Sequence, residues 1–206
     1  MTDSARRTRP HGDERRRQIL ASATRLFSEG GFARVSLGDV ARDVGLSQAG
    51  LLHHFPHKSA LLLAVLQERE RGAEDPGLER PHGRAYVDQF IEVLAENERA
   101  PQLVRLFAIM SAESITEDHP AHEWFANRYE RLLATATAEL EAIVDPATLP
   151  AGITVTTLAQ WLIGLADGLR QQALILPGSV DRVASMRAFF AFLDPYLAPD
   201  AQPLGG

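Results

Sequence analysis

The chain has 206 residues, of which 45% are hydrophobic and 23% are charged, as in ordinary folded proteins. It contains no cysteine, so disulfides and thiolate metal sites are excluded. No apolar run approaches the roughly 20 residues that a membrane helix needs, and no apolar stretch of signal-peptide length follows the N-terminal arginines. We therefore expect a soluble, cytoplasmic protein.

The formal net charge of −6 is unevenly distributed along the chain. Residues 1–60 hold ten Lys and Arg against six Asp and Glu, a net charge of +4, whereas residues 61–206 carry −10. The acidic average argues against a nucleic-acid partner. A basic front on an acidic body is nevertheless typical of a DNA-binding head joined to a body that does not bind DNA.

Helical spacing of apolar residues is the dominant pattern along the chain. Residues 1–12 are polar, contain arginines and are interrupted by Pro and Gly, so we expect a disordered arm there. A first helix is expected from about Asp13 to Glu29. It ends at Gly30-Gly31, because glycine readily adopts the left-handed backbone that stops a helix.

Two short helices follow, separated by the turn Gly45-Leu46-Ser47. Ser36 caps the first helix, and Ser47 caps the second, which runs from Gln48 to about His54. The second helix ends there because Pro56 disfavours helical backbone at the residue before it. A fourth helix is expected from near residue 58 to about residue 71.

The remainder of the chain also has helical periodicity. Residues 72–83, with two prolines and three glycines, form the expected junction. Helical patterns then cover about residues 84–97, 101–117, 120–144, 154–174 and 180–196, and no stretch alternates as a strand does. The sequence predicts an all-α fold of about nine helices. A three-helix head with a linking fourth helix occupies residues 13–72, and a larger helical bundle for ligand binding and dimerisation occupies residues 73–206.

The two short helices meet the requirements of a helix-turn-helix. Gly45 suits the tight turn, and Ala41 is small enough for the helices to cross closely. The alternative is an ordinary corner between two helices of a bundle. Against that alternative, the second helix leaves one face with nothing apolar to bury, made of Gln48, Ala49, Gly50, His53 and His54. Such a face fits the major groove of DNA better than a protein core.

The segment from Ser36 to Lys58, SLGDVARDVGLSQAGLLHHFPHK, resembles the DNA-binding domain of the TetR family of transcriptional regulators. The preceding helix, ending in Gly30-Gly31-Phe32, is similar as well, so the resemblance covers about residues 13–72. It implies a homodimer whose eighth and ninth helices form the interface, with a small-molecule pocket among helices four to eight. We therefore expect a regulator rather than an enzyme, with no cofactor and no membrane partner. Its partners would be double-stranded DNA, a second copy of the chain and a small-molecule effector.

The resemblance also implies roles for individual residues. Gln48, Ala49 and Gly50 would lie at the base-reading end of the recognition helix. His54 and Lys58 would lie close to phosphates, as would the two capping serines with their free backbone N–H groups. The expected DNA-binding residues are Arg16, Ser36, Ser47, Gln48, Ala49, Gly50, Leu52, His53, His54 and Lys58.

Two features of the head leave alternatives open. Family members usually carry an aromatic residue, most often Tyr, where this chain has Leu52, and leucine cannot donate a hydrogen bond to phosphate. Leu52 either contacts a thymine methyl group or packs inward, and we favour an apolar contact. Arg15, Arg16 and Arg17 either reach the DNA backbone or form a solvated cationic face.

The larger half carries more apolar residues than one helical stripe requires, and ordinary core explains most of them. In a ligand-responsive regulator some would line an apolar cavity. The expected lining residues are Phe107, Met110, Trp124 and Trp161. His119 and His122 have the i, i+3 spacing of helical metal ligands. His119 precedes Pro120, however, so we favour a polar helix entry over a metal site.

The last two helices present broad apolar faces, which are either protomer core or halves of a four-helix interface between two copies. The helix-turn-helix favours the dimer, since two-fold symmetry doubles the contacts on a palindromic site. The expected interface residues are Leu165, Leu169, Met186, Phe189 and Phe190.

The preferred hypothesis is a homodimeric repressor, released from a palindromic operator by a small, largely apolar ligand that changes the separation of the two recognition helices. A second hypothesis is a regulator without a natural ligand, whose larger half serves only for dimerisation. A third is a helical metal-dependent enzyme using Glu113, His119 and His122. The sequence offers that enzyme no nucleophile paired with a base and no phosphate-binding glycine loop.

Overall fold

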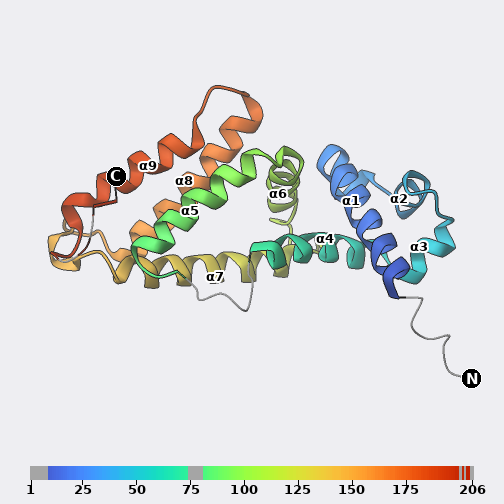
Figure 1. The fold of residues 1–206 in the computed structure, drawn as a ribbon, viewed down its shortest axis with the longest axis horizontal. Coiled ribbons are helices and arrows are strands. Elements are labelled where there is room, and N and C mark those ends of the chain that lie inside the picture. The colour runs from blue at the N-terminus through green and yellow to red at the C-terminus, as the bar shows by residue number, and fades with distance from the viewer. Residues whose placement is uncertain (1–8, 74–80, 200, 202, 205–206) are drawn as a thin grey trace, which may run out of the picture. The chain divides into compact units, whose positions relative to one another are not determined.

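The computed structural model of the protein describes residues 9–73, 81–199, 201, 203 and 204. These residues form nine α-helices and no strand, which confirms the all-α class for the part of the chain described. The helices are α1 (Arg9–Arg34), α2 (Leu37–Asp43), α3 (Gln48–His54), α4 (Lys58–Ala73), α5 (Arg84–Glu98), α6 (Pro101–Glu113), α7 (His122–Glu141), α8 (Val155–Ile175) and α9 (Arg182–Leu193) (Figure 1). Two short 3-10 turns, η1 (Pro146–Thr148) and η2 (Asp194–Tyr196), complete the fold.

The described chain divides into two compact units that do not follow the sequence order. The first unit, called here the head unit, contains α1 to α4 together with residues 105–124. The second, called here the bundle unit, contains residues 81–104 and the described residues from 125 onward. Both α6 and α7 cross the boundary, so residues 105–124 belong by sequence to the expected larger domain but pack with the head.

Helix α1 differs from the sequence expectation at both ends. It begins at Arg9, so the part of the expected arm from Arg9 to Gly12 is helical, and residues 1–8 of that arm lie outside the described residues. At the other end Gly31, with φ 72° and ψ 174°, breaks the helix as the glycine pair predicted, and a short helical piece then continues to Arg34. This backbone region is accessible almost only to glycine.

The core of the head unit is built from one apolar stripe on each of its helices. Helix α1 packs against α2 and α4, and α2 packs against α3. The fully or nearly fully buried side chains are Ile19, Leu20, Ala23 and Phe27 of α1, Val40 and Ala41 of α2, Leu51 of α3, Phe55, and Leu61, Leu62, Val65 and Leu66 of α4. Burial of each large side chain stabilises the fold by roughly 1.5–3 kcal/mol, so this core orients the short helices.

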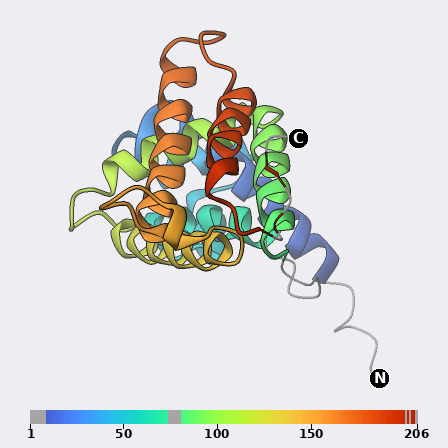
Figure 2. The same cartoon turned by 90° about the vertical axis from the view of Figure 1, so that its left-hand side faces the viewer.

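The bundle unit places α9 between α5 and α8. Helix α9 contacts both neighbours, and it runs beside α8 in both views (Figures 1 and 2). Helix α8 begins with a reciprocal capping box between Thr154 and Thr157. The buried residues of this unit include Ile91, Leu94, Leu140, Leu158, Leu162, Met186, Phe190 and Leu193. No helix among the described residues is long and apolar enough to cross a membrane.

Candidate nucleic-acid interface

Helix α2 starts at a reciprocal cap. The Ser36 hydroxyl oxygen accepts a hydrogen bond from the Asp39 backbone N–H at 3.1 Å, and the Asp39 carboxylate accepts one from the Ser36 backbone N–H at 2.9 Å. The side-chain and backbone hydrogen bonds from Ser36, together with one from Arg42, lower the pKa of Asp39 to about 2. Asp39 is therefore ionised at neutral pH, and its charge lies at the end of α2 where helix geometry favours an anion.

The turn between α2 and α3 depends on Gly45, whose φ is 66°. Its backbone N–H donates to the Arg42 carbonyl at 3.2 Å, and the next N–H, from Leu46, donates to the Ala41 carbonyl at 2.8 Å. These two bonds satisfy carbonyls that the end of a helix leaves free. Ala41 is 2% exposed, as expected for a residue inside a helix crossing.

Helix α3 presents nearly all of its surface to solvent. Its N-cap Ser47 accepts a hydrogen bond from the Gly50 backbone N–H at 3.1 Å, and the helix ends at Phe55, which has extended backbone before Pro56. Leu51 is the buried residue of α3. The remaining residues are exposed or partly exposed: Gln48, Ala49, Gly50, Leu52, His53 and His54. The structure thus brings the expected reading residues together on one accessible helix.

Leu52 is 40% exposed on this helix. The inward-packing alternative for this residue is therefore wrong, because the core position of α3 is taken by Leu51 one residue earlier. An apolar side chain remains on the surface that would face DNA.

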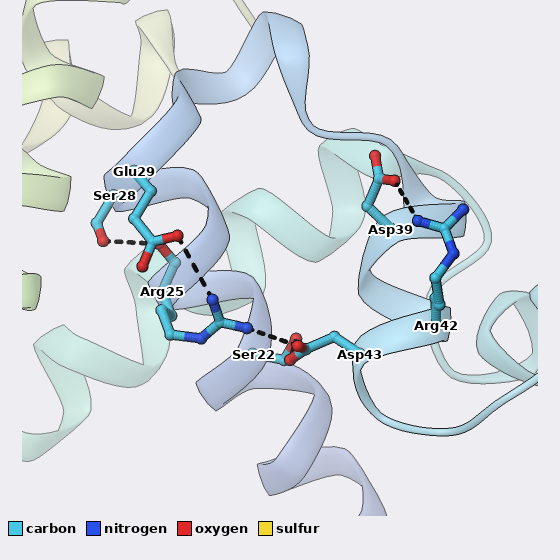
Figure 3. A network of polar contacts seen from close by, with 7 residues as sticks. All are labelled: Ser22, Arg25, Ser28, Glu29, Asp39, Arg42 and Asp43. Carbon is cyan, nitrogen blue, oxygen red and sulfur yellow. Dashed lines mark hydrogen bonds and ion pairs between the residues drawn. The ribbon is translucent and has the colours of Figure 1, made fainter.

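A polar network joins Asp43, the last residue of α2, to α1 (Figure 3). The Asp43 carboxylate accepts one hydrogen bond of 2.6 Å from the Ser22 hydroxyl and another of 2.6 Å from the Arg25 guanidinium. The hydrogen bond from Ser22 and that from Arg25 lower the pKa of Asp43. Arg25 also lies 3.4 Å from the Glu29 carboxylate of its own helix, whereas α2 is joined to α1 by the Asp43 hydrogen bonds with Ser22 and Arg25.

The three consecutive arginines of α1 have three different surroundings. Arg15 donates to the Val44 carbonyl at 3.2 Å and so satisfies the end of α2. The Arg16 guanidinium lies over the ring of Phe55, 4.5 Å from its centroid, at the end of α3. Arg17 pairs with Glu14 on the exposed side of α1. Of these arginines, Arg16 is the one that packs beside the recognition helix.

Lys58, expected near phosphate, has partners inside the head unit. Its ammonium donates to the Ala33 carbonyl at 3.3 Å and lies 4.2 Å from the centroid of the Phe32 ring. Burial lowers the pKa of Lys58, and the nearby Glu113 carboxylate opposes that effect. No local pattern in the sequence indicated these contacts, because Ala33 lies 25 residues earlier in the chain.

The expected pocket residues are only partly brought together. In the head unit, Phe107 and Met110 are buried, and the Phe107 ring meets the Trp124 ring edge-on at 5.8 Å between centroids. Trp161 lies on α8 in the bundle unit and is 46% exposed. A half-exposed tryptophan on a helix face is a surface residue of the protomer.

The expected interface residues need a correction. Met186 and Phe190 are fully buried and Leu169 is 8% exposed, so these side chains belong to the core of the protomer. The reason is that the apolar stripe of α9 packs against α5, where Phe90 meets Phe190 edge-on at 6.0 Å. Leu165 and Phe189 are partly exposed. The exposed large hydrophobic side chains on these two helices are Trp161 and Ile175 of α8 and Phe192 of α9.

The two histidines of the candidate metal site do not share a helix face. His119 lies in the turn before α7 and accepts a hydrogen bond at Nδ1 from the Ala121 backbone N–H, 3.2 Å away. His122 begins α7, and its Nδ1 lies 2.8 Å from the Ser114 carbonyl oxygen. Both rings therefore serve the entry of this helix.

Similarity to known proteins agrees with this geometry. Residues 19–65 match the profile for bacterial regulatory proteins of the tetR family, and residues 81–198 match that for the C-terminal part of BetI-type transcriptional repressors. The transcriptional regulator AcrR of Shigella flexneri is 26% identical over 92% of this chain and 92% of its own length. The regulator EthR of Mycobacterium tuberculosis is 30% identical over 74% of each chain.

Solved structures share the fold. A complex of SmeT with triclosan superposes with a TM-score of 0.70 at 20% identity, covering 92% of this chain and 95% of the other. A transcriptional regulator from Saccharomonospora viridis in complex with choline gives a TM-score of 0.67 at 21% identity, covering 90% and 98%. The fold expected from the sequence, a helix-turn-helix head followed by a helical bundle, is confirmed.

The fold and the exposed recognition helix define a DNA-binding transcriptional regulator of the helix-turn-helix type. The chain belongs to the TetR family, as the resemblance of its head predicted. Because that family consists of regulators, the hypothesis of a helical enzyme is set aside.

Proposed function

We propose that the protein is a homodimeric repressor that binds a palindromic operator through α3 of each protomer and leaves it when a small, largely apolar ligand binds. The observation that carries the proposal is the surface of α3, where six of seven residues are accessible and the seventh, Leu51, holds the helix to the core. Such a protein acts where the DNA lies, so we place it in the cytoplasm.

Base reading is assigned to the first turn of α3. Gln48 is the residue with a side chain suited to bidentate contact with adenine, while Ala49 and Gly50 allow the helix to approach the base edges closely. Leu52, on the same accessible helix, is assigned to a thymine methyl group. His53 is assigned to the edge of the same surface.

Phosphate contacts are assigned to the helix starts and to nearby cations. The capping serines Ser36 and Ser47 leave backbone N–H groups of α2 and α3 available to an anion. Arg16 and His54 lie near the end of α3 and supply further donors. We expect Lys58 to contribute less to phosphate binding, because its ammonium would have to leave the Ala33 carbonyl and the Phe32 ring to reach DNA.

The dimer is assigned to the exposed faces of α8 and α9. Gly164 and Gly168 lie on α8, and a Cβ built at either meets no atom within 4 Å among the described residues, apart from the backbone of α8 itself. Glycine inside a helix costs roughly 0.5–1 kcal/mol relative to alanine, which close approach of a helix from the second copy would offset. The residues assigned to this face are Trp161, Leu165, Gly164, Gly168, Phe189 and Phe192.

A small-molecule effector is supported by the similar structures, which include one complex with triclosan and one with choline. We assign Phe107, Met110 and Trp124 to its surroundings, since the buried Phe107 and Met110 combine an aromatic and a sulfur-containing side chain and the partly buried Trp124 packs on Phe107. A ligand can release the operator only if it binds the DNA-free spacing of the two heads more tightly than the bound one.

Binding to a labelled DNA fragment from the neighbouring promoter region tests the proposal, with a scrambled fragment of the same composition as the control. The expected result is sequence-specific binding that weakens steeply as salt rises, together with a dimer in sedimentation at micromolar concentration. Equal affinity for both fragments would contradict operator recognition. A monomer that still binds the operator specifically would contradict the dimer alone.

A further inference from the structure

The last residue of α6 reaches the break in α1. One oxygen of the Glu113 carboxylate accepts a hydrogen bond from the Phe32 backbone N–H at 2.9 Å. A Cβ built on Gly31 would lie 2.3 Å from the other oxygen, so the carboxylate fills the space that a side chain at position 31 would need. Glycine at position 31 is therefore favoured by its φ of 72°, and a side chain there would displace the Glu113 carboxylate.

His119, from the turn that follows α6, contacts the same two residues. Its Nε2 lies 3.7 Å from the Glu113 carboxylate, and its ring meets the Phe32 ring edge-on at 5.1 Å. Because Nδ1 accepts a hydrogen bond from Ala121, the neutral ring carries its proton on Nε2. That buried Nε2 has no hydrogen-bond partner within the described parts of the chain.

Phe32 is also where α4 is attached. The ammonium of Lys58, the first residue of α4, lies over the Phe32 ring and donates to the next carbonyl along, that of Ala33. Three pieces of the head unit thus meet at one residue: the break in α1, the start of α4 just after the recognition helix, and the turn between α6 and α7.

Of these three segments, the turn between α6 and α7 is the one that belongs to the larger domain expected from the sequence, residues 73–206. Helices α6 and α7, on either side of it, both continue across the boundary into the bundle unit. Glu113 is the last residue of α6, so a shift of α6 along its axis would move the Glu113 backbone, and His119 lies in the turn that follows. The contact of this turn with Phe32 consists of one hydrogen bond to Glu113 and the edge-on packing of the His119 ring, so a small displacement suffices to open it.

We propose that Glu113 is a positioning residue for DNA recognition, which holds the α1 break at Gly31-Phe32 and passes movement of α6 and α7 to the helix-turn-helix. The transmission of a ligand signal rests on the proposed function, whereas the holding of the break does not. Coupling free energies are reciprocal, so DNA bound to the head should also stabilise the residues between α6 and α7.

Amide hydrogen exchange of the full-length protein tests the first half without DNA. Glu113→Ala is compared with Glu113→Gln, which keeps an acceptor for the Phe32 N–H, and with Glu117→Ala, an exposed position in the same turn. We expect Glu113→Ala to speed exchange about tenfold in peptides covering residues 31–36 and 114–121, and Glu113→Gln to restore most of the protection. Glu117→Ala leaves residues 31–36 unchanged. Unchanged exchange at residues 31–36 in Glu113→Ala overturns the proposal.

The second half uses the promoter fragment. Operator binding should slow exchange of residues 114–121 several-fold in the wild type but not in Glu113→Ala, whose operator affinity falls with an unaltered salt slope because no phosphate contact is lost. If the operator binds and residues 114–121 exchange as before, the coupling is refuted while the repressor function stands. If no fragment binds specifically, the repressor function fails, and the exchange comparison without DNA still decides whether Glu113 holds the break.

Discussion

Ser22, buried in α1, donates a hydrogen bond of 2.6 Å to Asp43, the last residue of α2. This bond, with the one from Arg25, fixes where α2 ends relative to α1 and hence where the turn at Gly45 begins. The position of α3 therefore depends on these two hydrogen bonds, although Ser22, Arg25 and Asp43 all lie outside α3.

Ser22→Ala should therefore weaken DNA binding without removing a DNA contact. We expect the Tm to fall by about 2–4 °C and operator affinity to fall with an unchanged salt slope. The matched control is Ser28→Ala, since Ser28 is equally buried in α1 but donates to the Arg25 carbonyl of its own helix. Loss of operator affinity in both variants to the same extent would show that general stability, not the link to Asp43, is responsible.

Gly45→Ala should destabilise the head. A side chain at a φ of 66° costs roughly 1–2 kcal/mol, even though a Cβ there meets no atom within 4 Å. Thermal unfolding measures the cost. Gly12→Ala is the control, because that glycine lies inside α1 with ordinary helical backbone and equally open surroundings, so alanine there should stabilise slightly. A Tm unaffected by Gly45→Ala would mean that the turn relaxes freely.

Gly164→Leu tests the assignment of the dimer face. In an isolated protomer the Cβ of the new residue meets no other side chain within 4 Å among the described residues, and leucine has a higher helix propensity than glycine, so the protomer should fold normally. At an interface where two helices approach closely it should hold them apart, and we expect dissociation to monomers at micromolar concentration in sedimentation experiments. Gly12→Leu, on a different helix, should remain dimeric. A dimer unaffected by Gly164→Leu would place the interface elsewhere.

The stability of the head unit should depend on pH through His119. Burial lowers the pKa of His119 from its usual 6.5, with the Glu113 carboxylate opposing the effect, so the unfolded chain binds this proton more readily than the folded one. The resulting stability is full above pH 6.5 and is lost as the pH falls through the lowered pKa of the folded state. Wild-type protein should therefore lose more stability than His119→Gln between about pH 7.5 and about pH 5.5. Parallel losses in the two proteins would assign the pH dependence to other groups.

Leu52→Ala should lower operator affinity about three- to tenfold, the effect of removing a few buried methyl or methylene groups from an apolar contact. The salt slope should not change, since no phosphate contact is involved. Leu52→Tyr, which restores the hydroxyl that family members usually carry, should raise affinity. No gain in Leu52→Tyr would mean that the phosphate contact is unimportant for this protein.

The helix-turn-helix could be predicted because its signals are local. The caps Ser36 and Ser47, the turn glycine and Pro56 each act within a few residues, and the structure has the helix ends where these residues placed them. Contacts between distant segments could not be predicted in this way. Phe32 and Glu113 are 81 positions apart, and no local pattern around either residue indicates that they are in contact.

The bundle illustrates a second limit. The apolar stripe of α9 correctly indicated burial of Met186 and Phe190, but periodicity does not say which surface covers a stripe. Here α5 of the same protomer covers it, and the exposed Phe192 lies only two positions after the buried Phe190. Distinguishing core from interface required the three-dimensional arrangement.

The start of α5 is specified by a residue of α7. Its N-cap Gly83 has no side chain to bond the first turn, and the buried Glu139 carboxylate accepts the Gly83 backbone N–H at 2.8 Å while lying 3.0 Å from His82 Nδ1. A capping side chain cannot easily replace this contact, because Gly83 has a φ of 57° and a Cβ built on it would lie 3.0 Å from the Ile143 side chain. Glycine at position 83 should accordingly persist through the evolution of this branch of the family wherever α5 starts with the same backbone.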